Sequence, residues 1–375
     1  MKLRALLISL IAVIMLAGCS SDSNDNETAS NEDNNGEKQD LKVYTTVFPL
    51  YSMTKEIAGD TLEVESVYPK NVNMHNYEPS QKDILSYAKG DLFIYTNHEL
   101  DPVAKKIDET IGNDVEVLEA FDNKDEFIKD EHHHDHDHEG EDHDHDADHE
   151  HGEHDHDHEG EDHDHDADHE HGEHDHDHEG EDHDHDADHE HGEHDHDHDH
   201  HHGEFDPHVW LDPELSIQMA ENIKNKLVEL NPDEKETYEA NYETLKADLE
   251  DLSKELDEAT KDNSRDTVYI SHESIGYLAD KYDFEQVGIN GLNDDEPSQK
   301  ELTKMISDIK ETKTPYILKE QNVSSRLTDM VAKETDVEFL SFHNLEALTD
   351  NDPEDATYQS LMRENIKSLE KALHD

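Results

Sequence analysis

Six histidines lie outside the histidine-rich middle of this 375-residue chain, and three of them have a context that favours metal binding. His75 lies just past the strand-like run Leu62–Tyr68, and His272 directly follows the run Thr267–Ser271. His208 lies in the sequence Asp-Pro-His-Val-Trp-Leu-Asp-Pro, in which two prolines and a tryptophan fix a loop before a helix. Open α/β sheets bind ligands at the carboxyl ends of their strands, and imidazole is a ligand of several divalent metals. The three histidines together predict a metal site, whereas for any one of them a hydrogen-bonded loop histidine is an equally good interpretation.

The segments that hold these histidines alternate between short apolar runs and longer amphipathic stretches, as in βαβ units around parallel sheets. The predicted strands are Leu41–Val47, Leu62–Tyr68, Asp91–Thr96, Val115–Ala120, Thr267–Ser271, Pro315–Lys319 and Val337–Phe342. Between the two groups, apolar residues recur at steps of three and four, which predicts a long helix over Pro232–Thr260 with Asn231 as its N-cap. The stripe is short for a coiled coil, so packing against the chain's own domains is favoured. The predicted fold class is α/β, with two α/β lobes built on parallel sheets and joined by a long helix.

The middle of the chain is a low-complexity segment, and residues 132–202 hold 29 of the 35 histidines. A unit of His, Asp, Glu and Gly with a single Ala fills residues 134–153 and returns unchanged at 154–173 and 174–193. This unit has no apolar positions with which to stack on its neighbours, so a solenoid is excluded and disorder without metal is expected. The alternating histidines and aspartates favour many weak metal sites; the alternative is a solvated acidic insertion.

The first 40 residues are predicted to be a signal peptide and a tether and not a part of the fold. Two basic residues precede an apolar run from Ala5 to Ala17, which is too short to span a membrane but suits a signal peptide. The run ends in Leu-Ala-Gly-Cys, which resembles a bacterial lipobox and implies a lipid on Cys19, the only cysteine. A polar segment follows up to Asp40. The expected location is the extracytoplasmic face of the bacterial cell membrane, with the protein anchored through Cys19.

These patterns divide the chain into five segments. They are a signal peptide at 1–18, a lipidated flexible tether at 19–40, an N-terminal α/β lobe at 41–230 with a disordered insertion at 131–204, a linking helix at 231–262 and a C-terminal α/β lobe at 263–375. Charge limits the possible partners, because 101 acidic residues against 30 basic ones give a net charge of −71. Such a chain repels phosphate, so nucleic acid and anionic membrane surfaces are excluded as electrostatic partners.

Three motifs resemble those of zinc-binding solute-binding lipoproteins of bacterial ABC uptake transporters, a cluster that also includes manganese-binding, adhesin-like receptors. They are His-Asn-Tyr-Glu-Pro-Ser at His75, Asp-Pro-His-Val-Trp-Leu-Asp-Pro at His208 and Ser-His-Glu-Ser-Ile-Gly-Tyr-Leu at His272. The resemblance covers about residues 41–130 and 205–375. It implies two lobes bridged by a rigid helix, with the metal in the interlobe cleft. It also implies a fourth ligand after the last strand, and by position this is Glu346.

A supporting motif of the same family, Lys-Glu-Gln-Asn-Val-Ser-Ser, begins at Lys319. The chain departs from the family pattern at His343, where a proline or small residue is more usual, and at His98, where a glycine is more usual. His343 is three residues before Glu346, so it could compete for the metal or support the site; a histidine in a solvated loop is the favoured interpretation. His374, near the chain end, is expected to be unstructured.

Three imidazoles and one carboxylate are a borderline-soft ligand set that suits tetrahedral Zn²⁺, whereas Mn²⁺ prefers more oxygen. In the manganese-binding relatives the third ligand is typically a carboxylate, and here it is His272. With four protein ligands no position remains for an activated water, so the protein is not expected to be an enzyme. Zinc affinity is expected to fall as the pH drops through about 6.5, where imidazoles take up protons.

The resulting prediction is a monomeric, high-affinity receptor that captures extracellular Zn²⁺ and delivers it to an ABC permease in the membrane. The histidine-rich loop is then an auxiliary zinc collector of low affinity. Two alternatives stay open at this point. One is a manganese receptor of the same fold, and the other is a surface zinc store or adhesin in which the histidine-rich loop does the binding.

Overall fold

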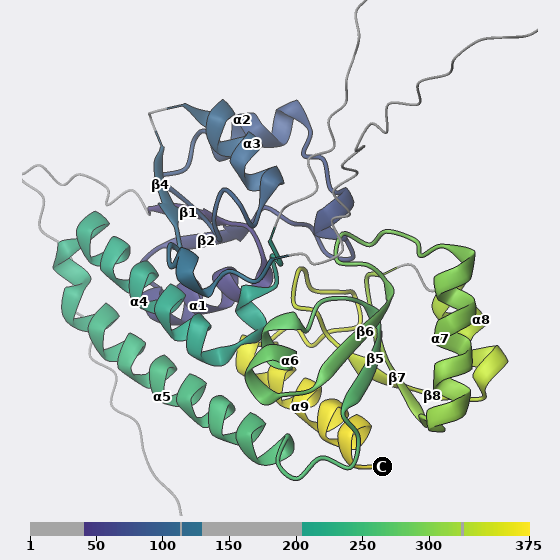
Figure 1. Ribbon diagram of the computed structural model, residues 1–375. Coiled ribbons are helices and arrows are strands. Elements are labelled where there is room, and N and C mark those ends of the chain that lie inside the picture. Colours follow the sequence, from purple (N-terminus) through teal and green to yellow (C-terminus); the bar gives the residue numbers. More distant parts are fainter. Residues whose placement is uncertain (1–40, 113–114, 130–204, 324–325) are drawn as a thin grey trace, which may run out of the picture. The chain divides into compact units, whose positions relative to one another are not determined.

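Figure 1 shows the helices and strands of the protein, coloured along the sequence. The computed structural model describes residues 41–112, 115–129, 205–323 and 326–375. The predicted signal peptide, the tether with Cys19 and the predicted insertion at 131–204 lie outside the described residues. Among the helices of the described ranges, none combines the length and the apolar character needed to span a bilayer.

The first lobe is built on a sheet of four parallel strands in the order β2-β1-β3-β4. Their bounds are β1 Lys42–Thr45, β2 Glu63–Ser66, β3 Leu92–Tyr95 and β4 Glu116–Glu119. Strand β3 is buried along its whole length and reads Leu-Phe-Ile-Tyr, as expected of an inner strand that is covered on both faces. Val43 of β1 pairs with Val64 on one side and with Leu92 on the other. The carboxyl ends of these three strands therefore reach the same edge of the sheet.

The second lobe repeats this arrangement with four parallel strands in the order β6-β5-β7-β8. Their bounds are β5 Thr267–His272, β6 Glu285–Asn290, β7 Tyr316–Glu320 and β8 Glu338–Phe342. Seven of the eight described strands agree with the strands predicted from the sequence, and β6 was not predicted. This strand has polar ends and an inner glycine, and it lies at the sheet edge beside β5. No apolar run marks it, because it is not covered like the inner strands.

Helices connect the parallel strands, as crossover connections between such strands require. The α-helices up to the second lobe are α1 Phe48–Ala58, α2 Gln81–Tyr87, α3 Pro102–Ile111, α4 Pro213–Leu230 and α5 Lys235–Ala259. Those of the second lobe are α6 Gly276–Tyr282, α7 Gln299–Thr312, α8 Arg326–Thr335 and α9 Tyr358–His374. Capping boxes at Ser80, Ser298 and Thr357 fix the starts of α2, α7 and α9. His374 ends α9, so the expectation that it is unstructured was wrong.

The long helix α5 carries the chain from the first lobe to the second, and its predicted apolar stripe is buried against α1, α4 and α9. The predicted start was wrong in detail, because Pro232–Glu234 forms a 3₁₀ turn before the α-helix begins. The Asn231 amide does not cap this turn but donates to the Tyr238 hydroxyl at 3.2 Å. After the helix, Asp262 adopts a left-handed conformation with φ of 56°, which breaks the helical path.

A continuous apolar core joins the two lobes, and a smaller core lies between the second sheet and helices α7 and α8. Trp210 is fully buried in the larger core, and its indole Nε1 donates to the carbonyl of Asn344 at 2.8 Å. The Tyr358 hydroxyl on α9 donates to the carbonyl of Trp210 at 2.7 Å. The loop that carries His208 is therefore held by residues of the second lobe.

Candidate metal centre

His75 lies in a 3₁₀ turn, Met74–Asn76, that follows β2. The side-chain oxygen of Asn73 accepts a hydrogen bond from the backbone N–H of His75 at 2.8 Å and so caps the turn. The Asn73 amide also donates to Asp294 of the second lobe at 3.1 Å. The turn is thereby tied to both lobes, and only 7% of the His75 side chain is exposed.

His208 precedes a short 3₁₀ turn and helix α4, as the two prolines around it predicted. Asp206 Oδ1 accepts hydrogen bonds from the backbone N–H and from the ring Nδ1 of His208, at 2.9 and 2.8 Å. The carboxylate keeps the proton on Nδ1, so Nε2 is the nitrogen left to face the other ligands. The His208 side chain is fully buried.

His272 is the last residue of β5, not the first residue after the strand. Glu320 ends the neighbouring strand β7, and its Oε1 lies 3.2 Å from His272 Nδ1. Ser271 and Ser274 donate to the same carboxylate at 2.7 and 2.8 Å. On the other side of the ring, Nε2 lies 3.2 Å from the carbonyl oxygen of Leu292. The parallel pairing of β5 with β7 thus supplies a carboxylate that orients the imidazole.

Glu346 lies in the loop after β8, and its side chain is fully buried. Its Oε2 accepts from the backbone N–H of Met74 at 3.0 Å, and its carbonyl oxygen accepts from the N–H of Phe48 at 3.1 Å. Both donors belong to the first lobe. A loop of the second lobe is therefore docked on the first lobe, with Oε1 of Glu346 turned toward the histidines.

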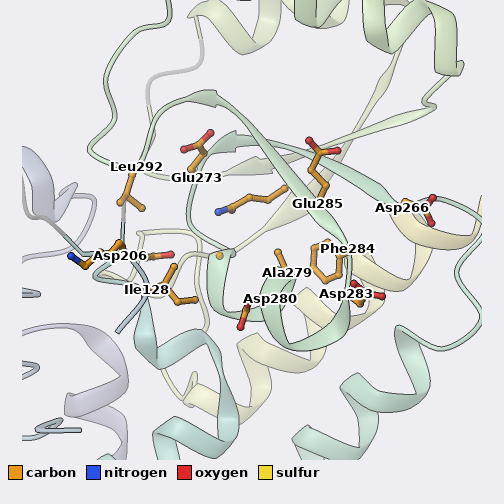
Figure 2. Close-up of a pocket in the computed structure, with 13 residues that line it drawn as sticks. Ile128, Asp206, Asp266, Glu273, Ala279, Asp280, Asp283, Phe284, Glu285 and Leu292 are labelled. Atoms are coloured by element: carbon orange, nitrogen blue, oxygen red, sulfur yellow. The ribbon is translucent and has the colours of Figure 1, made fainter. Parts of the chain in front are cut away.

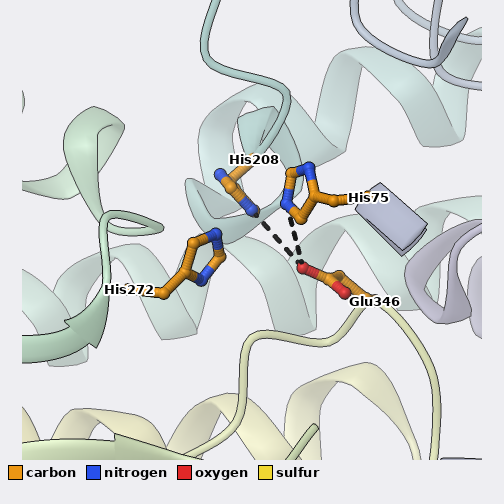
Figure 3. Close-up of side chains that lie close together, drawn as sticks. All are labelled: His75, His208, His272 and Glu346. Atoms are coloured by element: carbon orange, nitrogen blue, oxygen red, sulfur yellow. Dashed lines mark ion pairs between the residues drawn. The ribbon is translucent and has the colours of Figure 1, made fainter. Parts of the chain in front are cut away.

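The four predicted ligand residues lie together, with their side chains pointing toward one another (Figure 3). One ligand atom from each of His75, His208, His272 and Glu346 lies within 4.8 Å of the others. Glu346 Oε1 lies 3.5 Å from Nε2 of His75 and 3.6 Å from Nε2 of His208. These three atoms are buried and have no hydrogen-bond partner among the described residues. Buried polar atoms without partners are destabilising, so this donor set fits a small cation that all of them can bind.

Burial and neighbouring charges shift the pKa of each of these groups. Burial is the largest influence on His75 and lowers its pKa. Burial also acts to lower the pKa of His208 and His272, but the carboxylates near their Nδ1 atoms outweigh it; the pKa of His208 is raised and that of His272 reaches about 9. For Glu346, burial acts to raise the pKa, but the facing imidazoles hold it well below its usual value. A metal must therefore displace a proton from His272 at neutral pH, so the expected fall in affinity begins well above pH 6.5.

Two residues that act on the ligands were not predicted from the sequence. Asp206 lies two positions before His208, inside the motif that drew attention to that histidine. Glu320 is the second residue of the supporting motif that begins at Lys319. Both motifs were recognised, but the contacts of these carboxylates with imidazole rings follow only from the fold.

The two histidines that depart from the family pattern lie outside the cluster. His98 Nε2 lies 2.9 Å from Asp108 Oδ2, and its ring stacks on Tyr95. His343 is 4% exposed, so the interpretation as a histidine in a solvated loop was wrong. Its ring nitrogens bond to Asp352 and to the backbone N–H of Leu345 rather than to the cluster.

A cavity of about 780 Å³ has an acidic lining (Figure 2). Its acidic lining residues are Asp206, Asp266, Glu273, Asp280, Asp283 and Glu285. It shares Asp206 with His208, and Leu292, whose carbonyl faces His272, also lines it. Lys129 lines the cavity too, and it forms a β-bridge with Phe205. The negative lining attracts cations to the residues next to the cluster.

The family described as zinc-uptake complex component A, periplasmic (ZnuA), matches residues 43–372. The chain belongs to the ZnuA family. Two relatives are the zinc-binding lipoprotein AdcA of Streptococcus pneumoniae and the high-affinity zinc uptake system protein ZnuA of Bacillus subtilis. The first is 29% identical over 99% of this chain, which spans only 61% of that relative's length. The second is 28% identical over 99% of this chain and 98% of the relative.

A solved structure of a relative is similar in fold to this ZnuA-family chain. The Zn(II)-bound ZnuA-like domain of Streptococcus pneumoniae AdcA is 26% identical, with a TM-score of 0.62 over 90% of this chain and 100% of that one. The predicted α/β fold of two lobes with parallel sheets is confirmed. The family resemblance of the three histidine motifs is confirmed as well.

Proposed function

We propose that this ZnuA-family protein captures one Zn²⁺ between its lobes and delivers it to an uptake transporter. The observation that carries the proposal is the set of buried, unpartnered ligand atoms on His75, His208 and Glu346. His272 supplies the fourth ligand through Nε2, which the metal takes over from the carbonyl oxygen of Leu292, while Glu320 engages Nδ1. The family's description as a zinc-uptake component and the zinc-bound structure of a relative support the same function.

The donor set favours zinc and favours capture over catalysis. Three imidazole nitrogens and one carboxylate oxygen suit tetrahedral Zn²⁺, whereas a manganese receptor is disfavoured because His272 offers nitrogen in place of oxygen. Four protein ligands fill a tetrahedral site and leave no position for a reactive water. The protein therefore acts as a carrier and not as an enzyme.

Delivery to an ABC permease is supported by membership of a family that is described as a zinc-uptake complex component. In this proposal the protein is a monomer, held by lipid on Cys19 at the extracytoplasmic face of the cell membrane. The Leu-Ala-Gly-Cys sequence that ends at Cys19 supports the anchor, and the pneumococcal relative is named a lipoprotein. The histidine-rich insertion collects zinc at low affinity. The acidic cavity, whose lining runs from Lys129 to the His208 partner Asp206, attracts the collected cations toward the main site.

The receptor function is tested by measuring zinc stoichiometry and affinity of the full-length chain in competition with a chelating dye. His272→Ala removes a ligand, and His98→Ala is the matched control, because His98 also pairs with a carboxylate but lies outside the cluster. We expect one tight site in the wild type and in the control, and its loss in His272→Ala. Weak, graded binding that is equal in all three proteins would place metal binding in the histidine-rich insertion and refute the receptor proposal.

Deleting residues 132–202 separates the main site from the collector. The tight site should stay, and several weaker sites should disappear. Loss of the tight site together with the insertion would contradict the four-ligand proposal. Growth in zinc-poor medium tests the uptake role itself, since a deletion strain should fail there, whereas loss of a zinc store should matter mainly when zinc supply fluctuates.

A further inference from the structure

His343 is a buried histidine outside the ligand cluster, and both nitrogens of its ring have a partner. Nδ1 accepts a hydrogen bond from the backbone N–H of Leu345 at 2.9 Å, and Nε2 lies 3.2 Å from Asp352 Oδ2. Because Nδ1 is the acceptor, the ring proton is on Nε2 and is donated to Asp352. The side chain of Asn365 on α9 bonds to both the N–H and the carbonyl of His343, each at 2.7 Å. The position of Nδ1 is therefore fixed from three sides.

The residue that His343 contacts has an unusual backbone conformation. Leu345 has a φ of 65°, in the left-handed region, and is the only apolar residue among the described residues with positive φ. A side chain on Cβ disfavours this region, and leucine has no polar group with which to compensate locally. Its side chain is fully buried. Such a conformation persists only where the surroundings hold it.

The turn at Leu345 sets the direction of the ligand Glu346. On one side of the turn, the carbonyl of Asn344 accepts from the Trp210 indole at 2.8 Å. On the other side, the N–H of Glu346 donates to the Asn344 side chain at 3.2 Å. The N–H of Leu345 lies between these anchors, and its acceptor is His343. A rotation of the backbone at Leu345 would swing the Glu346 carboxylate away from the imidazoles.

We propose that His343 is a positioning residue of the metal site: by accepting the N–H of Leu345, it holds the left-handed turn that aims Glu346 at the metal. The inference rests on the proposed zinc-binding function and deepens it. Asp352 and Asn365 act through His343, since they fix the ring and the backbone of that residue. None of these three residues touches the metal.

Two substitutions separate the roles of the two ring nitrogens. In His343→Asn, the side-chain oxygen can take the place of Nδ1 and accept from Leu345, while the bond to Asp352 is lost. In His343→Gln, the longer amide can reach Asp352 but leaves the Leu345 N–H without an acceptor. Zinc affinity of each full-length variant is measured by competition with a chelating dye. We expect His343→Asn to match the wild type and His343→Gln to bind about 10- to 100-fold more weakly, the range observed when a residue that orients a metal ligand is lost.

A glycine at the strained position supplies the rescue experiment. Glycine adopts a positive φ without strain, so a chain with glycine at position 345 no longer needs His343 to hold the turn. The double variant with Leu345→Gly and His343→Gln should therefore bind zinc nearly as tightly as Leu345→Gly alone. Circular dichroism and the unfolding temperature report the fold of each variant, and a merely structural role of His343 would move these without the Asn–Gln difference in zinc binding.

Three results would overturn the proposal. They are wild-type affinity in His343→Gln, weaker binding in His343→Asn than in His343→Gln, and an affinity loss on His343→Gln that is as large in the Leu345→Gly variant as in the wild type. A wild-type chain that lacks a tight zinc site would instead refute the proposed function. The two failures are therefore distinguishable in one set of titrations.

Discussion

Replacing Glu320 by Gln should change the pH dependence of zinc binding more than the affinity at pH 7. The Glu320 carboxylate faces Nδ1 of His272 and is the main cause of the raised pKa of that imidazole, about 9. Zinc binds the neutral imidazole, so below pH 9 it must displace a proton from His272. Without the negative charge of Glu320, burial dominates and the pKa of His272 falls toward or below its ordinary value.

The magnitude follows from the size of the shift. A pKa of about 9 lies about two pH units above neutrality, which at about 1.4 kcal/mol per unit weakens zinc binding at pH 7 by about 2.7 kcal/mol, or roughly a hundredfold. Loss of the orienting carboxylate weakens binding by about 10- to 100-fold at every pH. At pH 7 the two effects of Glu320→Gln largely offset each other. At pH 9 only the loss remains, so the ratio of wild-type to variant affinity should grow by up to about a hundredfold between pH 7 and pH 9.

The assay is competition with a chelator of known protonation constants at pH 7, 8 and 9, on full-length wild type and Glu320→Gln. The raised pKa of His208 acts in both proteins, so only the ratio of the two affinities is diagnostic. Glu56→Gln is the control, because this half-buried carboxylate bonds to Ser52 and Gln359 instead of to a histidine. An affinity ratio that stays constant across the three pH values would refute the argument that Glu320 sets the protonation of His272.

Three further predictions concern other parts of the molecule. Asp206→Asn removes the charged partner of a ligand histidine and should weaken zinc binding by about 10- to 100-fold in the same competition assay; unchanged binding would contradict its orienting role. Asn73→Ala breaks both the interlobe bond to Asp294 and the bond that caps the His75 turn, each worth about 1 kcal/mol, so zinc release measured by stopped flow with excess chelator should be roughly 30-fold faster. Leu249→Ala opens a cavity under α5 and should lower the free energy of unfolding by about 2–5 kcal/mol in chemical denaturation. Leu85→Ala, at a side chain that is 65% exposed, should change it by no more than about 0.5 kcal/mol. Equal losses in the two variants would refute the claim that the apolar stripe of α5 is part of the core.

Most of the fold could be predicted because inner parallel strands and an amphipathic helix leave clear patterns. The run Leu92–Tyr95 is apolar throughout because both faces of β3 are covered. Strand β6 has no apolar run of this kind. It contains Gly288, which the fold requires because a Cβ there would collide with the side chain of Glu273, and this constraint exists only in the folded chain. The start of α5 was misplaced because Pro232–Glu234 forms a 3₁₀ turn before it, and the Asn231 side chain makes no capping bond there.

The ligand residues divide by the kind of information that located them. Each ligand histidine lies in a local motif, but Glu346 was placed only through the family resemblance, because nothing in its own neighbourhood marks a ligand. Glu320 and His272 are 48 positions apart and meet through the two strands that carry them. The burial of His343 likewise depends on α9, whose Asn365 clamps its backbone, and no local pattern indicates that contact.

The bonds that hold the lobes together and the atoms that bind the metal both contribute to the free energy of lobe closure. The backbone N–H of Met74 in the first lobe donates to Glu346 of the second, and Asn73 donates to Asp294 in the same direction. Each such bond contributes about 1 kcal/mol, while each buried ligand atom without a partner costs about 1–3 kcal/mol. Zinc removes that cost, so metal binding and closure of the lobes favour each other. Because the coupling is reciprocal, a partner that draws the lobes apart lowers zinc affinity without touching a ligand, and under the proposed function a docked permease would release the metal in this way.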